Sequence, residues 1–588
     1  MCGIFGAVGK KLNKYDRDGI KPILSSLSNR GPDGSGTLFL SSVVLGHTRL
    51  SIIDLKSGDQ PMKDAISDTY IIFNGEIYNY KELKEGLIGK GHQFITNSDT
   101  EVILKSYTEY GTDCLDHLDG MFAFAIWDEK KKLLFLARDR FGKKPLYYTF
   151  DKDGNFLIAS EIKALFAAGI RGEINPEAID NYLTLMYVPP WKSIYKNIHI
   201  IPPAHAGVFE NGKIKIWKYW ELREKPIKDS YGETKEKIKK LFEDSVKKRM
   251  VADVEIGSLL SGGVDSTLVS FYAQKFSKTP IKTFSVGYEG YINELPYAKE
   301  ASEKIGTDHY TIQVKGETEN ELEKVIKYMD EPHADSSNFP QHLVSELASS
   351  KVKVALSGDG ADELFMGYGW YWKYWNMQKH TQLKNAIFSN PFKEHLKNLS
   401  IFSKKDRMEI WKDPSFVNDD IVGYVKTVRK NNIKKVNLFD LMTYLPGQLL
   451  TKIDHTSMMH SLEIRSPFLD YKLAEYVYNI PEEYKHDKKG GKIILKDILS
   501  EIMPKEFVYR RKQGFGAPIK EWLLEEKMEK FVRKELGESL NMYEYLNKGE
   551  INKILSAFYE KGDGTLCYKI WSILCLSLWF KHHGKYHV

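Results

Sequence analysis

Short apolar strands alternate with helical segments in the second half of the chain. The strands cover residues 255–260, 283–287 and 353–357, and a helical segment over 233–250 precedes the first of them. Strands that alternate with helices form a parallel sheet covered by helices, because each crossover between parallel strands needs a long connection. From about Tyr368 onward the pattern is mostly helical. The sequence therefore predicts an α/β domain with a parallel sheet and a largely helical C-terminal part.

Residues 1–212 have a different pattern. Strand-forming runs occur at 43–47, 70–73, 121–127 and 133–137, and runs with helical spacing occur at 80–89 and 98–110. These strands and helices do not alternate regularly, so they predict a layered α+β domain. Around 213–229 the sequence changes to charged residues with a proline. We therefore divide the chain into a first domain over 1–212, a linker over 213–232 and a second domain over 233–588.

The composition is that of an ordinary globular protein. Hydrophobic residues make up 42% and charged residues 28% of the 588 positions, and the net charge of +6 is not gathered in a basic block. We therefore expect neither nucleic acid nor a membrane as a partner. Four cysteines without a C-x-x-C pair favour a reduced cytoplasm. No signal peptide is visible, and the longest apolar run, 567–580, is shorter than the about 20 residues of a membrane span, so it predicts a buried helix.

Cys2 combines two reactive groups if Met1 is removed, which a small second residue permits. The thiol and a free α-amine would then belong to one residue. An α-amine has a pKa of about 8, so it can accept the thiol proton near neutral pH, and the thiolate can attack a carbonyl. The structural alternative is a small buried apolar residue at the start of a first strand over 3–8.

A candidate phosphate site lies in the turn Ser261-Gly262-Gly263-Val264-Asp265-Ser266, between an apolar strand and a helix. Glycines allow backbone N–H groups to approach an anion, and a helix N-terminus adds partial positive charge. Ser266 can serve as the N-cap of the helix. The spacing and the lysine of a Walker A loop are absent from this turn. A tight glycine turn without a ligand is the structural alternative.

The third strand of the second domain also ends in polar residues. Ser357 and Gly358 are followed by the carboxylates of Asp359, Asp362 and Glu363. Ligands of parallel sheets bind at the carboxyl ends of the strands. Closely spaced carboxylates repel one another unless a cation or a proton relieves them. Two strand ends with Ser-Gly and an acidic residue predict a Mg–ATP site, and a solvated acidic turn is the alternative.

Groups suited to amide hydrolysis occur in the first domain. Asn74-Gly75 offers a side-chain amide and a backbone N–H, which together can form an oxyanion hole for thiol attack. The same dipeptide alone also predicts a hairpin turn. Arg49 can bind a substrate carboxylate through two N–H groups, and Glu76 and Asp99 are available for an α-ammonium.

Five segments of the first domain resemble the class II, or N-terminal nucleophile, glutamine amidotransferases: Met1-Cys2-Gly3-Ile4-Phe5-Gly6, Arg30-Gly31-Pro32-Asp33, His47-Thr48-Arg49-Leu50-Ser51-Ile52, Asn74-Gly75-Glu76-Ile77-Tyr78-Asn79 and Gly120-Met121-Phe122-Ala123-Phe124-Ala125. The turn at 261–266 resembles the PP-loop of the ATP pyrophosphatases, which cleave ATP between the α and β phosphates. Together, over residues 1 to about 520, the chain resembles the glutamine-hydrolysing asparagine synthetases of the B type. The resemblance implies two antiparallel sheets between helices, followed by a PP-loop synthetase domain.

The resemblance implies roles for individual residues. In the first domain Cys2 is the nucleophile, Asn74 and Gly75 form the oxyanion hole and also bind glutamine, and Arg49, Glu76 and Asp99 hold glutamine. In the second domain the ATP site consists of Leu260, Ser261, Gly262, Gly263, Asp265, Ser266, Val286, Ser357 and Gly358. Asp265 and Asp362 hold Mg²⁺, and Lys492 neutralises the phosphates, although a lone lysine is otherwise a solvated charge. Asp359 is a candidate base in amide formation, and Arg465 is a candidate for binding the acceptor amino acid.

Some positions near the acceptor depart from the family pattern. Asp359 is shorter than the glutamate of some members, and Ala361 and Met366 replace glycine or another small residue. The aromatic run 368–375 follows directly. We expect this run to pack in the core, and the alternative is that it shapes the acceptor pocket.

The resemblance implies synthesis of L-asparagine from L-aspartate, L-glutamine and ATP through β-aspartyl-AMP, with AMP, pyrophosphate and glutamate as the other products. Ammonia would pass between the domains through an apolar tunnel, because free ammonia is protonated in water near pH 7. The alternative is a related enzyme that amidates another carboxylate, such as a sugar acid or a peptide. A sulfur-inserting tRNA enzyme would need a C-x-x-C pair or a basic face for RNA, and the sequence has neither. A homodimer is expected from the family alone.

Overall fold

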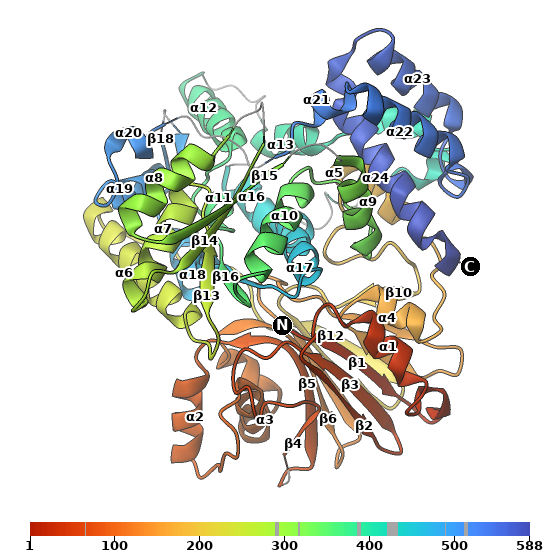
Figure 1. The fold of residues 1–588 in the computed structure, drawn as a ribbon, viewed down its shortest axis with the longest axis vertical. Coiled ribbons are helices and arrows are strands. Elements are labelled where there is room, and N and C mark those ends of the chain that lie inside the picture. The colour runs from red at the N-terminus through yellow and green to blue at the C-terminus, as the bar shows by residue number, and fades with distance from the viewer. Residues whose placement is uncertain are drawn as a thin grey trace.

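The computed structural model describes residues 1–588 except 65, 289–292, 315–317, 385–389, 420, 422–432, 488–489, 511–515 and 588. Two antiparallel sheets form the first domain, and a parallel sheet with many helices forms the second (Figure 1). The predicted fold class is confirmed for both parts. The N-terminus lies where the two domains meet (Figure 1).

The first domain is a sandwich of two six-stranded sheets. The first sheet has the order β10-β8-β9-β1-β3-β2 and consists of β1 (Gly3–Val8), β2 (Gly34–Phe39), β3 (Val43–Arg49), β8 (Tyr147–Phe150), β9 (Phe156–Ala159) and β10 (Ile198–Ile200). The second has the order β12-β11-β7-β6-β5-β4 and consists of β4 (Met62–Asp64), β5 (Thr69–Ile77), β6 (Gly120–Asp128), β7 (Leu133–Arg138), β11 (His205–Glu210) and β12 (Lys213–Lys218).

Alternating side chains of both sheets fill the space between them. Ile4 of β1, Leu45 of β3, Ile72 of β5 and Ala125 of β6 belong to this buried cluster, as expected for strands with one face toward a shared core. Helices α2 (Tyr80–Gly89) and α3 (Asp99–Tyr110) lie outside the second sheet, and α1 (Ile20–Ser26) and α4 (Ile162–Ala167) lie outside the first (Figure 1). This layering places β1, which begins directly after Cys2, in the middle of its sheet.

The linker begins later than the sequence predicts. Residues Lys213–Lys218 form β12, which pairs with β11 and places Ile216 opposite Gly207. Lysines alternate with Ile214 and Ile216 in this strand, a pattern that suits an exposed edge. The linker therefore covers 219–230, and α6 (Tyr231–Arg249) starts behind a capping box formed by Ser230 and Glu233.

The second domain is built on a five-stranded parallel sheet with the order β15-β14-β13-β16-β17. Its strands are β13 (Ile256–Leu259), β14 (Lys282–Tyr288), β15 (Asp308–Val314), β16 (Val354–Leu356) and β17 (Glu463–Arg465). The sequence predicted β13, β14 and β16 and missed the two edge strands. One of them, β15, contains no buried residue, and β17 is only three residues long, so neither has the apolar run of a central strand.

Helices make up most of the remaining second domain. They are α7 (Val264–Phe276), α8 (Leu295–Ile305), α9 (Thr318–Tyr328), α10 (Asn338–Ser349), α11 (Ala361–Leu364), α12 (Gly369–Lys384), α13 (Pro391–Leu399), α14 (Lys404–Ile410), α16 (Ile433–Phe439), η4 (Asp440–Leu450), α17 (Thr451–Met458), α18 (Tyr471–Asn479), α19 (Ile493–Leu499), α20 (Lys505–Val508), α21 (Ile519–Leu523), α22 (Glu526–Glu538), α23 (Lys548–Tyr559) and α24 (Cys567–His583). A further helix, α5 (Pro176–Leu185), precedes β10 in the chain. As predicted, the run 567–580 is a buried helix. In the described part of the chain, no helix combines the length and the apolar character needed to cross a bilayer.

The aromatic run after the acidic turn packs mainly in the core. Tyr371, Tyr374 and Trp375 of α12 are buried in one cluster with Tyr187 and Met366. The predicted packing role is therefore confirmed for these three aromatic side chains.

Candidate active sites

Cys2 lies beside the middle of β5, where Asn74 and Gly75 are located. The backbone N–H of Cys2 donates to Oδ1 of Asn74 at 3.0 Å, which fixes the orientation of the amide. Nδ2 of Asn74 is buried and has no hydrogen-bond partner among the described residues. A buried donor without a partner is costly in the free protein, so it is available to a ligand oxygen. The predicted nucleophile and the predicted oxyanion hole are therefore brought together.

Gly75 lies inside β5 rather than in a turn, so the hairpin interpretation of Asn74-Gly75 is wrong. Its backbone runs close to the neighbouring strand. A Cβ at this position would lie 2.1 Å from the carbonyl oxygen of Met121 and 2.7 Å from Cα of Phe122. Only glycine allows β5 and β6 to approach this closely, and the missing side chain leaves the backbone beside Asn74 open.

The Cys2 thiol needs a base in order to react. Burial raises its pKa, against the lowering effect of the N-terminal amine. With Met1 present, that α-amine belongs to Met1 and lies 3.1 Å from Oε2 of Glu463. Glu463 comes from β17 of the second domain. The predicted base, an α-amine on Cys2 itself, forms only after Met1 is removed.

Two buried acids lie next to the nucleophile. Glu76 follows Gly75 on β5, and Asp99 is the first residue of α3. Burial raises the pKa of both carboxyl groups, to about 6 for Asp99. Oε1 of Glu76 has no hydrogen-bond partner within the described chain. An α-ammonium in this place would relieve both acids, so their environment is consistent with the predicted glutamine-binding role.

Arg49 holds the loop that closes this pocket. Its guanidinium donates to the backbone oxygen of Asp54 at 2.6 Å and to Oδ1 of Asp59 at 2.8 Å. The pocket is lined by Met1, Cys2, Arg49, Leu50, Ile52, Ile53, Gly58, Gln60, Phe73, Gly75, Glu76, Ser98, Asp99, Thr100 and Glu463, and its volume is about 30 Å³. Such a cavity has room for roughly two water molecules. A ligand carboxylate at Arg49 would have to replace these loop oxygens.

The two predicted nucleotide loops lie side by side at the carboxyl ends of β13 and β16. These strands are parallel neighbours, with Ser258 opposite Leu356. A Cβ on Gly358 would lie 2.8 Å from Cβ of Asp265 in the other loop. Gly262 has a φ of +75°, and a Cβ there would lie 2.5 Å from the carbonyl carbon of Tyr297. The glycines therefore permit both the turn and the contact between the loops.

Ser266 does not cap the helix as predicted. Helix α7 begins at Val264 and its N-cap is Gly263. Oγ of Ser266 instead accepts the N–H of Ser261 at 3.2 Å and lies 3.1 Å from Oγ of Ser261, so it closes the loop from inside. Behind the loop, the N–H of the buried residue Leu260 donates to the oxygen of Phe284 at 2.9 Å. Phe284 lies two residues before Val286 on β14.

Asp265 and Asp362 are held together by Lys492. Nζ of Lys492 lies 2.8 Å from Oδ1 of Asp362 and also contacts Oδ2 of Asp265. One cation therefore already bridges the two predicted metal carboxylates. Mg²⁺ is commonly bound by one or two carboxylates together with substrate phosphates, so this pair fits a metal–nucleotide complex. The described residues hold no group of three or more His, Cys, Asp or Glu side chains that could bind a metal by themselves.

Asp359 lies close to a cation that the sequence analysis did not single out. Burial raises the pKa of Asp359, and the charge of Lys452 and a hydrogen bond with Ser357 act against this. Nζ of Lys452, in α17, donates to Oγ of Ser337 at 2.8 Å and lies 3.6 Å from Asp335. Lys452 is buried, and its only sequence signal is a lysine within an apolar helical segment. It could hold an acceptor carboxylate beside Asp359.

Glu363 and Arg510 also border the nucleotide site. The hydroxyl of Tyr368 donates to Oε1 of Glu363 at 2.5 Å, and Oε2 has no partner in the described structure. Burial and the nearby Asp362 raise the pKa of Glu363 to about 8. Nη2 of Arg510 donates to the oxygen of Gly262 at 2.5 Å. Sequence analysis missed Arg510, which brings a second positive charge to the PP-loop.

Arg465 does not reach the acceptor side. Its guanidinium donates to Glu463 at 2.7 Å and to Oε2 of Glu76 at 2.8 Å. Nη1 donates to the backbone oxygens of Arg249 and Val251 at 2.8 and 2.7 Å. The side chain is fully buried at the junction with the first domain. This placement contradicts the predicted role of Arg465 in binding the acceptor.

Comparison with known proteins agrees with this arrangement of two sites. Residues 237–581 match the family described as asparagine synthase, and residues 1–220 match the glutamine amidotransferase domain. The chain belongs to the asparagine synthase family. The amidotransferase match ends close to Lys218, where the second sheet ends in the structure.

Relatives of known name cover most of the chain. "Asparagine synthetase [glutamine-hydrolyzing] 1" of Bacillus subtilis is 33% identical over 98% of this chain and 96% of its own length. "Asparagine synthetase [glutamine-hydrolyzing] 3" of the same organism is 36% identical over 88% and 87%. "Amidase chyE" of Penicillium rubens is 28% identical over 90% and 89%.

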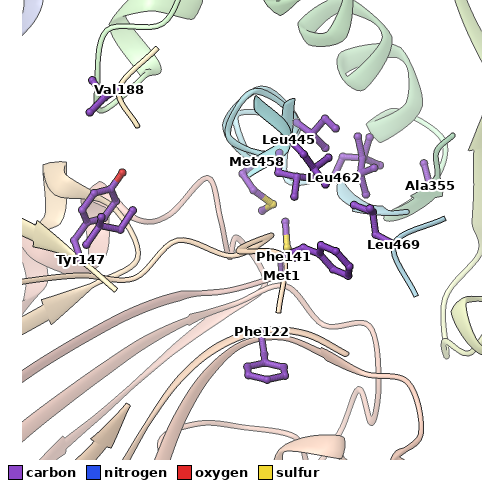
Figure 2. Close-up of a cluster of buried hydrophobic side chains, with 14 of the residues drawn as sticks. Met1, Phe122, Phe141, Tyr147, Val188, Ala355, Leu445, Met458, Leu462 and Leu469 are labelled. Carbon is purple, nitrogen blue, oxygen red and sulfur yellow. The ribbon is translucent and has the colours of Figure 1, made fainter. Parts of the chain in front are cut away.

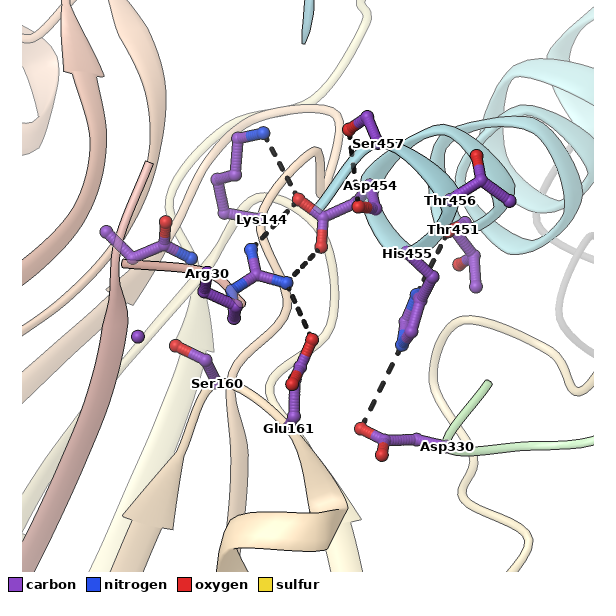
Figure 3. A network of polar contacts seen from close by, with 12 residues as sticks. Arg30, Lys144, Ser160, Glu161, Asp330, Thr451, Asp454, His455, Thr456 and Ser457 are labelled. Atoms are coloured by element: carbon purple, nitrogen blue, oxygen red, sulfur yellow. Dashed lines mark hydrogen bonds and ion pairs between the residues drawn. The ribbon is translucent and has the colours of Figure 1, made fainter. Parts of the chain in front are cut away.

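In this member of the asparagine synthase family, buried charges join the two domains. Arg30 of the first domain donates to both carboxylate oxygens of Asp454 at 2.7 and 3.1 Å, and Lys144 lies 3.2 Å from the same carboxylate (Figure 3). Arg30 also bonds Glu161 at 3.0 Å. Because all four side chains are buried, loss of one partner would leave an uncompensated charge. The domains are therefore fixed to each other beside the Cys2 pocket.

Proposed function

We propose that this protein is a glutamine-hydrolysing asparagine synthetase. It converts L-aspartate, L-glutamine and ATP to L-asparagine, L-glutamate, AMP and pyrophosphate. The observation that carries the proposal is the presence, in one chain, of a thiol beside an unpaired amide donor and of two carboxylates bridged by a lysine at paired strand ends. The names of the two Bacillus relatives support the same reaction.

Glutamine hydrolysis is assigned to the first domain. The Cys2 thiolate attacks the side-chain amide carbon, and the carbonyl electron pair moves to the oxygen, which Nδ2 of Asn74 and the N–H of Gly75 receive. The tetrahedral intermediate collapses, the C–N bond breaks, and protonation of the leaving nitrogen releases ammonia and leaves a thioester. Water then cleaves the thioester to glutamate and free thiol. Arg49, Glu76 and Asp99 hold the α-carboxylate and α-ammonium groups during these steps.

Activation of aspartate is assigned to the paired loops of the second domain. Asp265 and Asp362 would hold Mg²⁺, which neutralises charge on the released pyrophosphate. An oxygen of the β-carboxylate attacks the α-phosphorus, and the bond to the β-phosphate oxygen breaks. The PP-loop at the N-terminus of α7, with Lys492, stabilises the leaving phosphates. Lys452 orients the carboxylate of the acceptor.

Amide formation completes the reaction beside Asp359. Ammonia attacks the acyl carbon of β-aspartyl-AMP, AMP leaves, and the nitrogen loses a proton. Asp359 can accept this proton because burial raises the pKa of its carboxyl group. Its short side chain requires the nitrogen to come close to the Ser357–Gly358 loop.

Ammonia must travel from Cys2 to this loop without entering bulk water. Apolar side chains, including Met1, Phe141, Met458, Leu462 and Leu469, gather between the domains (Figure 2). An apolar path keeps ammonia neutral, because a protonated ammonium would have to leave its hydration shell. We place the ammonia route through this cluster.

The remaining expectations concern location and assembly. The described cysteines are all free, which suits a reducing cytoplasm. The partners of the enzyme are then its small substrates, and a homodimer stays a prediction from the family.

A product assay tests the proposed function. Purified full-length protein receives ATP, Mg²⁺ and glutamine with aspartate, and asparagine, AMP and pyrophosphate are quantified together. We expect the three products in equal amounts. Parallel reactions contain sugar acids or small peptides in place of aspartate. If AMP and pyrophosphate form only with one of these, the chain amidates another acceptor and the proposal is wrong.

A further inference from the structure

Arg465 connects the glutamine site with the second domain. Its Nη2 donates to Oε2 of Glu76 at 2.8 Å, and both side chains are buried. Glu76 follows Gly75, so its carboxylate is attached to the strand that carries the oxyanion hole. A group from the second domain therefore controls where this acid points.

The backbone of Arg465 is bonded to the nucleotide loop. Its carbonyl oxygen accepts the N–H of Ser357 at 2.9 Å, and Leu356 lies opposite Arg465 in the register of β16 and β17. Oγ of Ser357 lies 3.2 Å from Oγ of Ser466. A shift of the Ser357 loop on nucleotide binding would thus be transmitted directly to Arg465.

A second connection runs through the segment that leads into β13. Nη1 of Arg465 donates to the backbone oxygens of Arg249 and Val251. Two residues later, the N–H of Asp253 donates to the oxygen of Ile52 at 2.9 Å, and Oδ2 of Asp253 accepts the N–H of Asp54 at 2.8 Å. The segment held by Arg465 therefore contacts the loop that closes the glutamine pocket.

One oxygen of Glu76 is bound to Arg465, and the other has no partner among the described residues. Glu76 is expected to receive the α-ammonium of glutamine, yet one of its oxygens is already bound to the guanidinium of Arg465. A planar guanidinium with fixed donor directions cannot follow a moving carboxylate without giving up its other bonds. A movement of the guanidinium would therefore draw Oε2 of Glu76 with it and change where Oε1 can meet the substrate.

We propose that Arg465 is a positioning residue that couples the two sites. Nucleotide and acceptor at the Ser357 loop shift β17, which releases Glu76 toward glutamine and raises the affinity for glutamine. With the loop free of nucleotide, Arg465 retains Glu76 and glutamine binds weakly. This inference rests on the proposed function and adds to it the order in which the sites work. By linkage, glutamine raises the affinity for nucleotide by the same factor, about 5–150-fold in typical coupled sites.

The test measures glutaminase activity of the full chain with and without aspartate and α,β-methylene-ATP, which cannot release pyrophosphate. In the wild type, we expect the KM for glutamine to fall at least about 5-fold when both ligands are present. In R465Q the KM should be the same with and without them, while ammonia-dependent asparagine synthesis stays near the wild-type rate. R465K keeps the positive charge but loses the planar guanidinium with its fixed donors. In this variant the two ligands should lower the KM for glutamine less than in the wild type.

A matched control is K353A. Lys353 pairs across the domains with Asp33 at 2.7 Å but is exposed and touches neither site through its side chain, so this variant should couple like the wild type. Retained ligand dependence in R465Q would overturn the proposal. An equal loss of ammonia-dependent synthesis and glutaminase activity would also overturn it, since it would reveal a merely structural role. If R465Q does not fold, the same KM comparison is made with R465K, and a ligand dependence equal to that of the wild type would overturn the proposal.

Failure of the inference is distinguishable from failure of the proposed function. A wild-type protein that makes no asparagine would refute the function. A wild-type protein that makes asparagine but shows no effect of the nucleotide-site ligands on glutamine KM would refute the coupling alone.

Discussion

The glutamine site and the nucleotide site differ in how their polar groups are satisfied. In the glutamine site, Nδ2 of Asn74 and Oε1 of Glu76 are buried without partners among the described residues. In the nucleotide site, Asp265 and Asp362 share an ion pair with Lys492. The first site thus presents polar groups without partners on β5, whereas the two carboxylates expected to hold the metal in the second site form an ion pair with a lysine.

This difference has a chemical consequence. An oxyanion hole works when its donors are fixed before the reaction, because reorganisation then costs nothing. A metal–phosphate site must instead exchange one set of charges for another, so Lys492 has to share its carboxylates when a divalent ion and a nucleotide arrive. The first site therefore depends on geometry and the second on charge exchange.

Loss of the nucleophile is expected to have the largest effect on one site without affecting the other. Cys2→Ala should reduce glutamine-dependent synthesis by about 10⁵-fold or more, as for other nucleophile deletions. Ammonia-dependent synthesis should stay within about 2-fold of the wild type, because Cys2 does not touch the nucleotide loops. Both rates are measured by asparagine formation, with circular dichroism as a check on folding. If both nitrogen sources fail equally in a folded variant, the division into two sites is wrong.

Asp362→Asn is expected to impair the nucleotide site and to leave the glutamine site active. Removing one negative charge from the two carboxylates expected to hold Mg²⁺ should lower asparagine synthesis from either nitrogen source by roughly 10²–10³-fold. Glutamine hydrolysis measured without nucleotide should be unchanged. A variant that still makes asparagine at the wild-type rate would show that Asp362 does not hold the metal.

A smaller effect concerns the lysine bridge between the carboxylates. Lys492→Met leaves Asp265 and Asp362 facing each other in a partly buried place, which should lower the free energy of unfolding by about 1–3 kcal/mol in EDTA. Mg²⁺ should restore much of this loss in the variant and stabilise the wild type less. Denaturant unfolding with EDTA and with Mg²⁺ measures both effects. An equal Mg²⁺ response in the two proteins would contradict the bridging role.

The smallest predicted effect is on the pH dependence of stability in the first domain. Burial lowers the pKa of His47 to about 3, and its Nε2 lies 3.3 Å from the oxygen of Phe73 on β5. Its folded pKa is below the unfolded value of about 6.5, so its contribution to stability is present above pH 6.5 and is lost as pH falls toward 3. At pH 5 the loss is about 2 kcal/mol. His47→Gln should flatten the fall in unfolding free energy between pH 7 and 5, and an unchanged slope would contradict a buried neutral histidine.

The sequence predicted the parts of each site that lie on one strand or one loop. These parts have unusual residue types before, within or directly after a strand. They are Cys2, Asn74-Gly75 and the two Ser-Gly turns. Contacts between distant segments were not predictable in this way. Lys452 comes close to Asp359 through folding of the second domain, whereas the Arg30–Asp454 and Arg465–Glu76 pairs depend on how the two domains pack. No local sequence pattern encodes either kind of packing.

The errors have the same physical origin. The resemblance implied that Arg465 binds the acceptor, but it is the last residue of β17 and its side chain bonds Glu76 of the first domain. Ser266 has the chemistry of an N-cap, yet the chain enters the helix at Val264, so the serine closes the loop instead. The start of the linker was misplaced because the lysines of β12 resemble a solvated segment until β11 pairs with them.

The central claim is that the two sites work as one enzyme with a protected path for ammonia. The most direct measurement supplies amide-¹⁵N glutamine, aspartate, ATP and Mg²⁺ together with an excess of unlabelled ammonium, and determines the ¹⁵N content of the asparagine amide by mass spectrometry. Transfer through the apolar cluster between the domains predicts ¹⁵N in the asparagine far above the share of label in the ammonium pool. Asparagine labelled only to the level of that pool would contradict it.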